Sequence, residues 1–331
     1  MTNQMVDYKA DLDQRYWEYQ KSRFLVWQKF FDRPRAKKMC PPVFDGAGQN
    51  VIVNPNASQP EIDALFALLP VSDRHKWFRS MNSSQALAQS VLGNLAIYGF
   101  LNILAELRDD DNGMPLLGKA EVLSDNFKME FKIDYLGEHP LHCTSLDGYL
   151  GGDYRVAIEC KFTESEVGTC SKPQLTSADS KYESDHCNGS YTRQRARKER
   201  CTLWEKGALC WKYIPQLFHW KNDVDLIPCP LNKNYQLVRN ILAVGVNPDE
   251  QVSSANGHVV LIYDKRNPAF QEDGKGLVAF EETRRFLQEP TMLRKCSWQL
   301  IVQHMRNKGI LNWLTEELKL KYGMEDLARN S

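Results

Sequence analysis

The sequence predicts a mixed α/β fold, in which helices precede a three-stranded antiparallel meander and further helices and one strand follow it. The main observation is that the hydrophobic period changes from 3.6 residues, typical of helices, to 2 residues, typical of strands, near residue 128. A hydrophobic fraction of 42% in 331 residues is also enough for a sizeable core. A charged fraction of 25% with zero net charge excludes a disordered chain and gives no global sign of a polyanionic partner.

The first eighty residues are predicted to form a helical extension. Residues 8–31 place aromatic and aliphatic side chains at helical spacing, which predicts one long or two short amphipathic helices. A loop rich in Pro, Gly and Asn spans 41–60, and another helix is predicted over 60–69. We therefore assign 1–80 to an N-terminal helical extension and 81–331 to the main domain.

The main domain is predicted to begin with a helix and to continue with the meander. The helix covers 83–107, with Asn82 or Ser83 as its N-cap. Strict alternation of polar and apolar residues predicts a first strand over 128–136. Two further strands, over about 142–150 and 154–163, are joined by a turn at Gly151-Gly-Asp153.

The part of the chain after the meander is predicted to be mainly helical. Residues 164–230 form a predicted insertion, which begins with a polar, irregular segment. The apolar run at 258–264 predicts a strand that is buried on both faces. The remaining predicted helices cover 201–219, 231–243, 280–288 and 297–322.

The third predicted strand carries the residues that point to chemistry. Its even positions are apolar, so alternation places Glu159 and Lys161 together on the other face, with the small Ala157 beside them. The same spacing in Glu317-Leu-Lys319 falls in a helical pattern, where solvated surface charge is the simpler interpretation. The strand context therefore distinguishes Glu159 and Lys161.

Asp147, on the preceding strand, is predicted to share this face. If the turn has three residues, Asp147 opposes Ala157 and is a diagonal neighbour of Glu159, with Cβ atoms about 7 Å apart. A turn of two or four residues would put the two carboxylates on opposite faces. The proposed chemistry therefore requires an odd turn length.

Two carboxylates and an amine in one place suggest hydrolysis of a phosphodiester with a divalent cation. The carboxylates of Asp147 and Glu159 repel each other unless a cation lies between them, and oxygen ligands suit Mg²⁺ or Mn²⁺. Lys161 could orient or deprotonate a water molecule and offset negative charge. The alternative is an exposed salt bridge between strands.

These residues resemble the PD-(D/E)XK nuclease superfamily. The resemblance rests on Asp147 in Thr144-Ser-Leu-Asp147, on Glu159-Cys-Lys161 at the end of a hydrophobic strand, and on Ser83-Ser-Gln-Ala86 at the start of the first core helix. It covers roughly 81–265, and the wider context of these residues resembles an uncharacterised prokaryotic branch of the superfamily.

The resemblance implies a restriction-endonuclease-like core, made of a helix, a three-stranded antiparallel meander, a helix and a strand, with N- and C-terminal helical extensions. It also implies that Asp147 and Glu159 hold the cation and that Lys161 assists the water. The sequence departs from the family pattern in having Leu146 before Asp147 and a long insertion after Lys161.

Four further residues are candidates for the same site. Glu130 could be an additional metal ligand or a surface charge of the first strand. Gln236 and Arg239, in a helix that resembles a Gln-bearing motif of the superfamily, could orient a ligand or a phosphate, although an ordinary polar helix face explains them equally well. Gln85 is a weaker supporting candidate, for which helix capping is an alternative role.

The cysteines allow a second metal site, which we do not favour. Cys170, Cys187 and Cys201, with His186, could bind Zn²⁺ or belong to an iron–sulfur site, but no Cys-x-x-Cys pair is present. Cys160 and Cys210 are predicted to be small buried core residues.

A local basic cluster in the insertion could contact a phosphate backbone. It consists of Arg193, Arg195, Arg197 and Lys198, with Tyr191 available for base stacking. A second basic run covers 21–38. Solvated helix faces are an alternative explanation for both.

Together these features predict a Mg²⁺-dependent endonuclease that hydrolyses DNA, in restriction or repair. The alternatives are a nuclease for RNA or branched substrates, and an inactive nuclease-fold protein that binds nucleic acid or a protein. The N-terminus lacks the apolar segment of a secretory signal and no run is long enough to span a bilayer, so we expect a cytoplasmic protein without a membrane partner. A homodimer is left open.

Overall fold

A five-stranded mixed sheet organises the chain. The computed structural model describes residues 3–24, 43–123, 125–138, 143–194 and 196–325. The strands lie in the order β1-β2-β3-β4-β5; their bounds are Phe127–Ile133, Thr144–Leu150, Arg155–Cys160, Gly257–Tyr263 and Leu293–Ser297. β1, β2 and β3 form an antiparallel meander, whereas β4 and β5 continue the sheet parallel to β3. The α/β fold class is confirmed.

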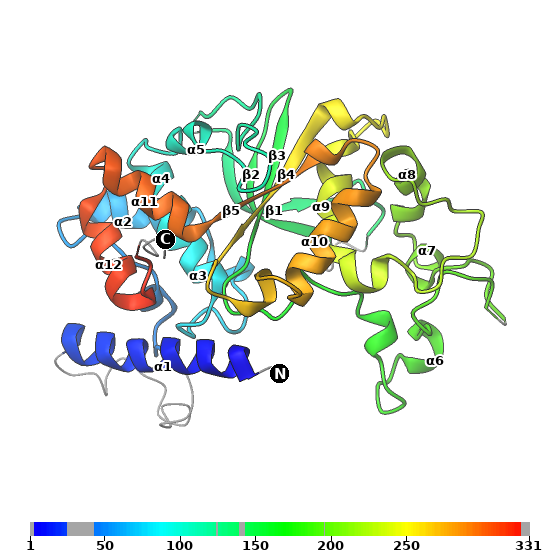
Figure 1. Cartoon of the computed structure of the whole chain (residues 1–331), viewed down its shortest axis with the longest axis horizontal. Helices are drawn as coiled ribbons and strands as arrows, with labels where there is room; N and C mark the ends of the chain where they lie inside the picture. The colour runs from blue at the N-terminus through cyan, green and yellow to red at the C-terminus, as the bar shows by residue number, and fades with distance from the viewer. Residues whose placement is uncertain (1–2, 25–42, 124, 139–142, 195, 326–331) are drawn as a thin grey trace.

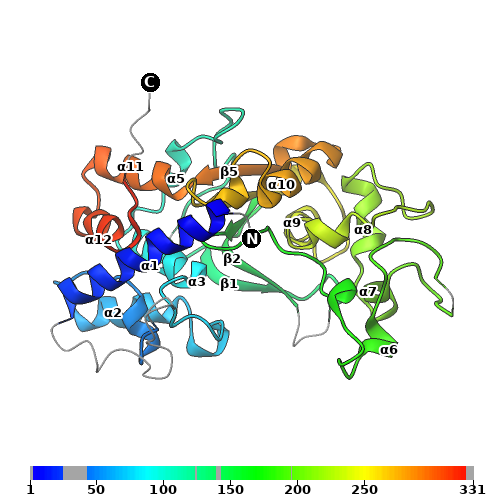
Figure 2. The ribbon, with the colours of Figure 1, turned by 60° about the horizontal axis from the view of Figure 1, so that its bottom comes forward.

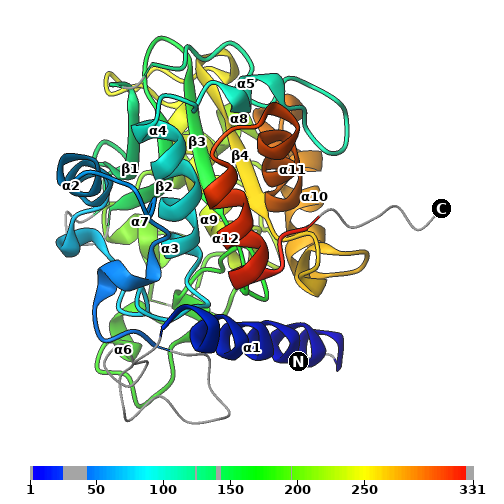
Figure 3. The same ribbon diagram turned by 90° about the vertical axis from the view of Figure 1, so that its left-hand side faces the viewer.

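Helices cover both faces of this sheet (Figure 1). One face lies against α3 (Ser84–Ala88), α4 (Asn94–Ile97), α11 (Trp298–Lys308) and α12 (Asn312–Tyr322), which stand in front of the strands in Figure 3. The other face lies against α9 (Leu231–Gly245), with α10 (Lys275–Phe286) packed on α9. The remaining helices are α1 (Asn3–Arg23), α2 (Gln59–Ala67), α5 (Ile103–Glu106), α6 (Tyr182–Asp185), α7 (Thr202–Glu205) and α8 (Cys210–Leu217). No helix in the described part of the chain is both long and apolar enough to cross a membrane.

β3 and β4 are the buried centre of the sheet. Every residue of both strands is buried, because each strand has a neighbour on either side and helices above and below. The two-sided burial predicted for 258–264 is therefore confirmed. For β3, the face that carries Glu159 is also buried, because α9 covers it.

Several predicted helices are interrupted. The predicted helix over 83–107 begins as expected, with the Ser83 side chain accepting a hydrogen bond from the Ala86 amide, but it contains the π-helical turn Gln89–Gly93 and ends at Ile97. The predicted helix over 297–322 is divided into α11 and α12, because Gly309 ends α11 with φ 67°. The predicted helix over 201–219 is likewise two helices, α7 and α8.

β5 was not predicted. Its sequence, Leu-Arg-Lys-Cys-Ser, lacks the alternation of a strand, yet all five residues are buried. Lys295 is buried because its ammonium pairs with Asp111 at 2.9 Å, and its backbone amide donates to Asp109 at 2.8 Å. These partners offset the free-energy cost of burying the charged side chain. They come from a distant part of the chain, so the sequence of the strand alone does not predict them.

The segment between β3 and α9, which contains the predicted insertion, carries α6, α7 and α8. These short helices lie together at one end of the molecule, beyond α9 (Figure 2). α8 packs against α9. The segment therefore reaches the sheet through α9.

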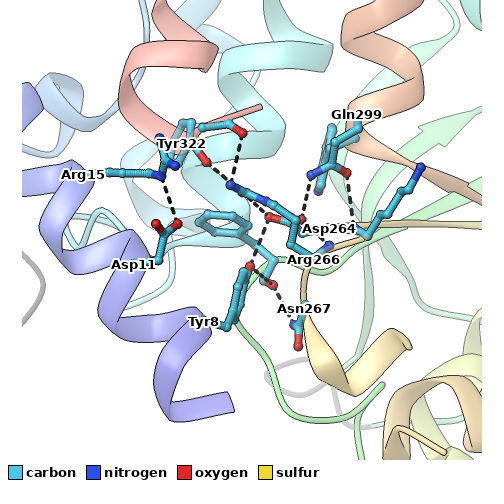
Figure 4. Close-up of polar contacts among 12 residues, drawn as sticks. Tyr8, Asp11, Arg15, Asp264, Arg266, Asn267, Gln299 and Tyr322 are labelled. Atoms are coloured by element: carbon cyan, nitrogen blue, oxygen red, sulfur yellow. Dashed lines mark hydrogen bonds and ion pairs between the residues drawn. The ribbon is translucent and has the colours of Figure 1, made fainter. Parts of the chain in front are cut away.

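A buried polar network joins the N-terminal helix to the sheet (Figure 4). Asp264, which follows β4 and is fully buried, accepts hydrogen bonds from Tyr8, Arg266 and Gln299. Arg266 also donates to the backbone oxygens of Tyr322, at the end of α12, at 2.7 Å, and of Gly323 at 3.1 Å. One carboxylate thus holds α1, α11 and α12 at the exit of β4.

We predict that Asp264→Ala destabilises the protein by about 3 kcal/mol, because it leaves the Arg266 guanidinium without its buried partner. The matched control is Asp11→Ala, which removes the surface ion pair of Asp11 with Arg15 and should change the free energy of unfolding by no more than about 0.5 kcal/mol. Urea unfolding measures both. Equal effects would show that the network does not hold the fold together.

Candidate functional site

The loop between β2 and β3 sets which residues meet across the two strands. Leu150 pairs with Val156, so the loop has five residues, 151–155, and the predicted three-residue turn is wrong. The length is still odd, so Asp147 and Glu159 keep the same parity. One step beyond the last pair, Gly148 with Ile158, Asp147 lies directly opposite Glu159 instead of diagonal to it.

A third carboxylate extends this row. In the pairing of β1 with β2, Met129 faces Gly148 and Phe131 faces Leu146, so Glu130 lies opposite Asp147. Glu130, Asp147 and Glu159 therefore occupy neighbouring positions on three adjacent strands.

The carboxylate of Asp147 lies where β2 and β3 separate. Its Oδ2 atom accepts a hydrogen bond of 2.6 Å from the backbone amide of Cys160. In a continuing antiparallel pair, a backbone carbonyl would satisfy such an amide. The side chain of Asp147 thus replaces a strand contact and is fixed at the end of the ladder.

Glu159 and Lys161 form a buried ion pair. The Lys161 Nζ atom lies 2.8 Å from Glu159 Oε1. Lys161 is 7% exposed and Glu159 is 1% exposed. α9 completes the arrangement from above the strand, because Asn240 donates to Glu159 Oε2 at 2.6 Å and Gln236 accepts from Lys161 Nζ at 3.0 Å. A buried ion pair is tolerated only when its remaining hydrogen-bonding groups are satisfied in this way.

Sequence reasoning identified Gln236 but missed Asn240. The two residues are four positions apart on α9 and so lie on one face of the helix. The i, i+3 spacing in the sequence points instead to Arg239 as the partner of Gln236. Arg239 lies elsewhere, over the ring of Tyr235 and 3.8 Å from Glu138. The i, i+4 amide pair was the signal that could have found Asn240.

Glu130 is held in an unusual backbone conformation. Its φ is 47°, which is rare for residues other than glycine and interrupts the regular alternation of β1. Gln85, at the start of α3, donates to Glu130 Oε1 at 2.5 Å, and Ser145 donates to Oε2 at 2.6 Å. The structure thus brings Glu130 and Gln85 together beside Asp147. Strained residues held by their surroundings are typical of functional sites.

Burial, together with repulsion from neighbouring carboxylates, makes Asp147 and Glu130 hard to ionise. Burial raises the pKa of Asp147 well above its usual value, and the charges of Glu159 and Glu130 raise it further. The pKa of Glu130 is also raised, first by burial, although hydrogen bonds from Ser145 and Gln85 act in the opposite direction. Glu130, Asp147 and Glu159 therefore form a cluster of carboxylates with too little positive charge nearby to balance them.

Lys161 is the one cation within this group, and it keeps its proton. Burial lowers the pKa of Lys161, but the carboxylates of Glu159, Glu164 and Asp147 outweigh burial, so the pKa is raised overall. The backbone of Lys161 is fixed as well. Its amide donates to Ile262 in β4 at 2.7 Å, and its carbonyl accepts from the Trp298 indole at 3.0 Å.

The donors fit a hard divalent cation. Within the described residues, no three His, Cys, Asp or Glu side chains form a complete metal-ligand set. Mg²⁺, however, is commonly held by one or two carboxylates, with water and phosphate oxygens at the remaining positions. Asp147 and Glu159 supply such a pair of carboxylates, and Glu130 lies beside them.

An open hollow of about 290 Å³ lies near this group of residues. It is lined by residues before and at the start of α3 and by residues after β3, among them Asn82, Gln85, Thr163 and Glu164. Gln85 binds Glu130, and Glu164 contributes to the charge around Lys161. The hollow is therefore connected to the site through Gln85 and Glu164, whereas Glu130, Asp147, Glu159 and Lys161 do not line it.

The predicted basic cluster is only partly available for binding. Arg193 and Lys198 are exposed, whereas Arg197 pairs with Glu205 at 2.8 Å. Arg195 and most of the 21–38 run lie outside the described residues. Tyr191 is not free for base stacking, since it is 2% exposed and stacks on Trp211.

A family model matches most of the chain. Residues 20–323 match the model of a family described as Restriction Endonuclease associating with ARP. Searches of curated proteins and of solved structures find no match.

The electrostatics of the site give a testable pH dependence. The pKa of Asp147 is higher in the folded than in the unfolded chain, so the folded state binds this proton more tightly, and stability is lost as the pH rises through the folded pKa. We predict that Asp147→Asn, which can still accept the Cys160 hydrogen bond, stabilises the protein by at least about 1 kcal/mol at about pH 8, with little effect at about pH 4.

Urea unfolding in EDTA at both pH values measures this difference. Asp134→Asn, at an exposed position just after β1, is the control and should have no effect at either pH. If Asp147→Asn were equally neutral at both, the repulsion within the carboxylate row would be absent.

Proposed function

The chain belongs to the family of restriction endonucleases associating with ARP, and from this premise we propose that it is a Mg²⁺-dependent endonuclease of the PD-(D/E)XK type that hydrolyses DNA phosphodiester bonds. The observation that carries the proposal is the convergence of Asp147, Glu159 and Lys161 where β2 and β3 separate. An acidic pair beside a buried amine is the arrangement expected for hydrolysis of a phosphodiester.

Asp147 and Glu159 would hold the cation, with Glu130 as a further ligand or as a partner of a bound water. When bound, Mg²⁺ or Mn²⁺ polarises a phosphoryl oxygen and lowers the pKa of a coordinated water. The pKa of Asp147 is raised first by burial and then by the charges of Glu159 and Glu130, and a bound cation would offset that repulsion, which supports this assignment.

In this proposal Lys161 acts as a charge and not as a base. Burial lowers its pKa, but the carboxylates of Glu159, Glu164 and Asp147 raise it overall, so the amine is protonated while no cation neutralises them. A fixed ammonium can orient the attacking water and offset the negative charge that develops on the phosphate. Between the two roles considered from the sequence, orientation is therefore favoured over deprotonation.

Gln236 and Asn240 act as positioning residues. Each bonds to one member of the Glu159–Lys161 pair, so α9 fixes both side chains in one rotamer. Rigid positioning of the reacting groups contributes to catalysis because the entropy of ordering them is lost before substrate binds.

We predict that Glu159→Gln and Lys161→Ala each reduce cleavage of plasmid DNA by about 10²-fold or more, because one loses the carboxylate charge and the other the ammonium. Cleavage is followed on gels with Mg²⁺ and, separately, with EDTA, which should abolish it. Circular dichroism confirms that each variant is folded.

The matched control is Lys319→Ala, which removes the lysine of the other Glu-x-Lys sequence, in α12, where the side chain is 44% exposed. This variant should cleave at the wild-type rate. Binding of DNA without any cleavage by the wild type would instead favour an inactive family member, and cleavage of RNA alone would assign another substrate.

The pH profile should depend on the cation concentration. Protons and Mg²⁺ compete for the carboxylates, and the pKa values of Asp147 and Glu130 are raised in the absence of a cation. We predict that the cleavage rate falls on the acid side and that the midpoint moves to lower pH as Mg²⁺ increases. A midpoint that does not respond to Mg²⁺ would mean that these carboxylates are not its ligands.

A further inference from the structure

Four cysteines from different segments border one small cavity. Cys170, Cys187, Cys201 and Cys229 are separated by long stretches of sequence, yet all four line a cavity of about 20 Å³ in the segment between β3 and α9. A cavity of this size has room for about one water-sized particle. All four are free thiols.

Backbone hydrogen bonds connect the segments that carry these cysteines. The amide of Cys170 donates to Asn232, three residues after Cys229, at 3.1 Å. The amide of Cys229 donates to Gly189, two residues after Cys187, at 2.8 Å. Cys201 is the N-cap of α7. The convergence is therefore built into the chain path and does not depend on side-chain rotamers.

From this arrangement we propose that Cys170, Cys187, Cys201 and Cys229 bind one structural Zn²⁺. Four thiolates in tetrahedral geometry, each about 2.3 Å from the metal, form a closed structural site. The small cavity suits a single ion and is too small for an iron–sulfur cluster. Lys172 and Arg200 also line the cavity, and each is paired with a carboxylate, that of Asp185 and that of Asp225.

Binding requires the thiols to turn inward. As the side chains stand, no described group of three or more His, Cys, Asp or Glu forms a metal-ligand set. Rotation between staggered χ1 positions moves a cysteine sulfur by about 3 Å. Such a change leaves the backbone ties in place.

A metal at this site would stabilise a segment that has little regular structure. The described segment before α8 contains only single turns of helix, α6 and α7, and one 3-10 turn, so little regular structure holds it. A bound metal supplies folding free energy to segments of this kind. The proposal departs from the interpretation favoured from the sequence, inert thiols, and adds Cys229 to the three cysteines considered there.

Elemental analysis of the purified full-length chain tests the proposal. We expect equimolar zinc, with at least about a tenfold loss of zinc affinity in Cys187→Ser and in Cys229→Ser. Cys143→Ser, which changes a half-buried thiol outside the cavity, is the matched control and should keep the metal.

A second measurement does not depend on whether the variants fold. Zinc should be released from the wild-type chain by a thiol-specific mercurial, and Co²⁺ added to the metal-free chain should give the visible absorption of a tetrahedral tetrathiolate. Absence of metal together with failure to bind Co²⁺ would overturn the proposal. Iron with inorganic sulfide, or disulfides between these cysteines, would overturn it too.

Discussion

A buried negative charge in the middle of the sheet is the constraint on which the site depends. Glu159 is 1% exposed, and a carboxylate in that position is costly unless both of its oxygens have partners. Lys161, directly after the same strand, and Asn240 on α9 provide them. This requirement fixes the face on which α9 packs and places Gln236, one turn earlier, against the Lys161 ammonium. The rows of Glu130, Asp147 and Glu159 then follow from the strand register alone.

Segments outside the meander hold the residues that directly follow β3. The carbonyl of Phe162, directly after Lys161, accepts hydrogen bonds from Tyr8 in α1 at 3.0 Å and from Asn267 at 2.7 Å. The carbonyl of Lys161 is bound by Trp298 at the start of α11. The N-terminal helix and the C-terminal helices therefore fix the exit of β3, and with it the direction in which Lys161 leaves the sheet. They are supports of the site although they supply none of its charged groups.

The sequence predicts the site better than its surroundings because strand alternation is a local rule. Parity alone places Asp147 and Glu159 on one face, and it holds whether the loop has three or five residues. The loop length itself depends on tertiary packing and was missed. β5 was missed for a similar reason, since the burial of Lys295 relies on Asp111, far away in the sequence. Asn240 was overlooked because its role depends on its contact with Glu159 of β3, which the sequence of α9 alone does not predict.

The cysteine cluster and the carboxylate site are connected through the first turns of α9. Cys229 precedes this helix by two residues, and Cys170 is bonded to Asn232 within it. Gly168, two residues before Cys170, accepts a hydrogen bond from the backbone amide of Gln236 and has a φ of 116°. Glycine has no Cβ, so the Gln236 side chain can lie very close to it: an added Cβ would be 2.3 Å from that side chain. Gln236 is thus enclosed between Gly168 and Lys161. The proposed metal, by holding Cys170 and Cys229 together, would also hold this end of α9. The same stretch of helix would then set both the stability of the insertion and the orientation of Lys161.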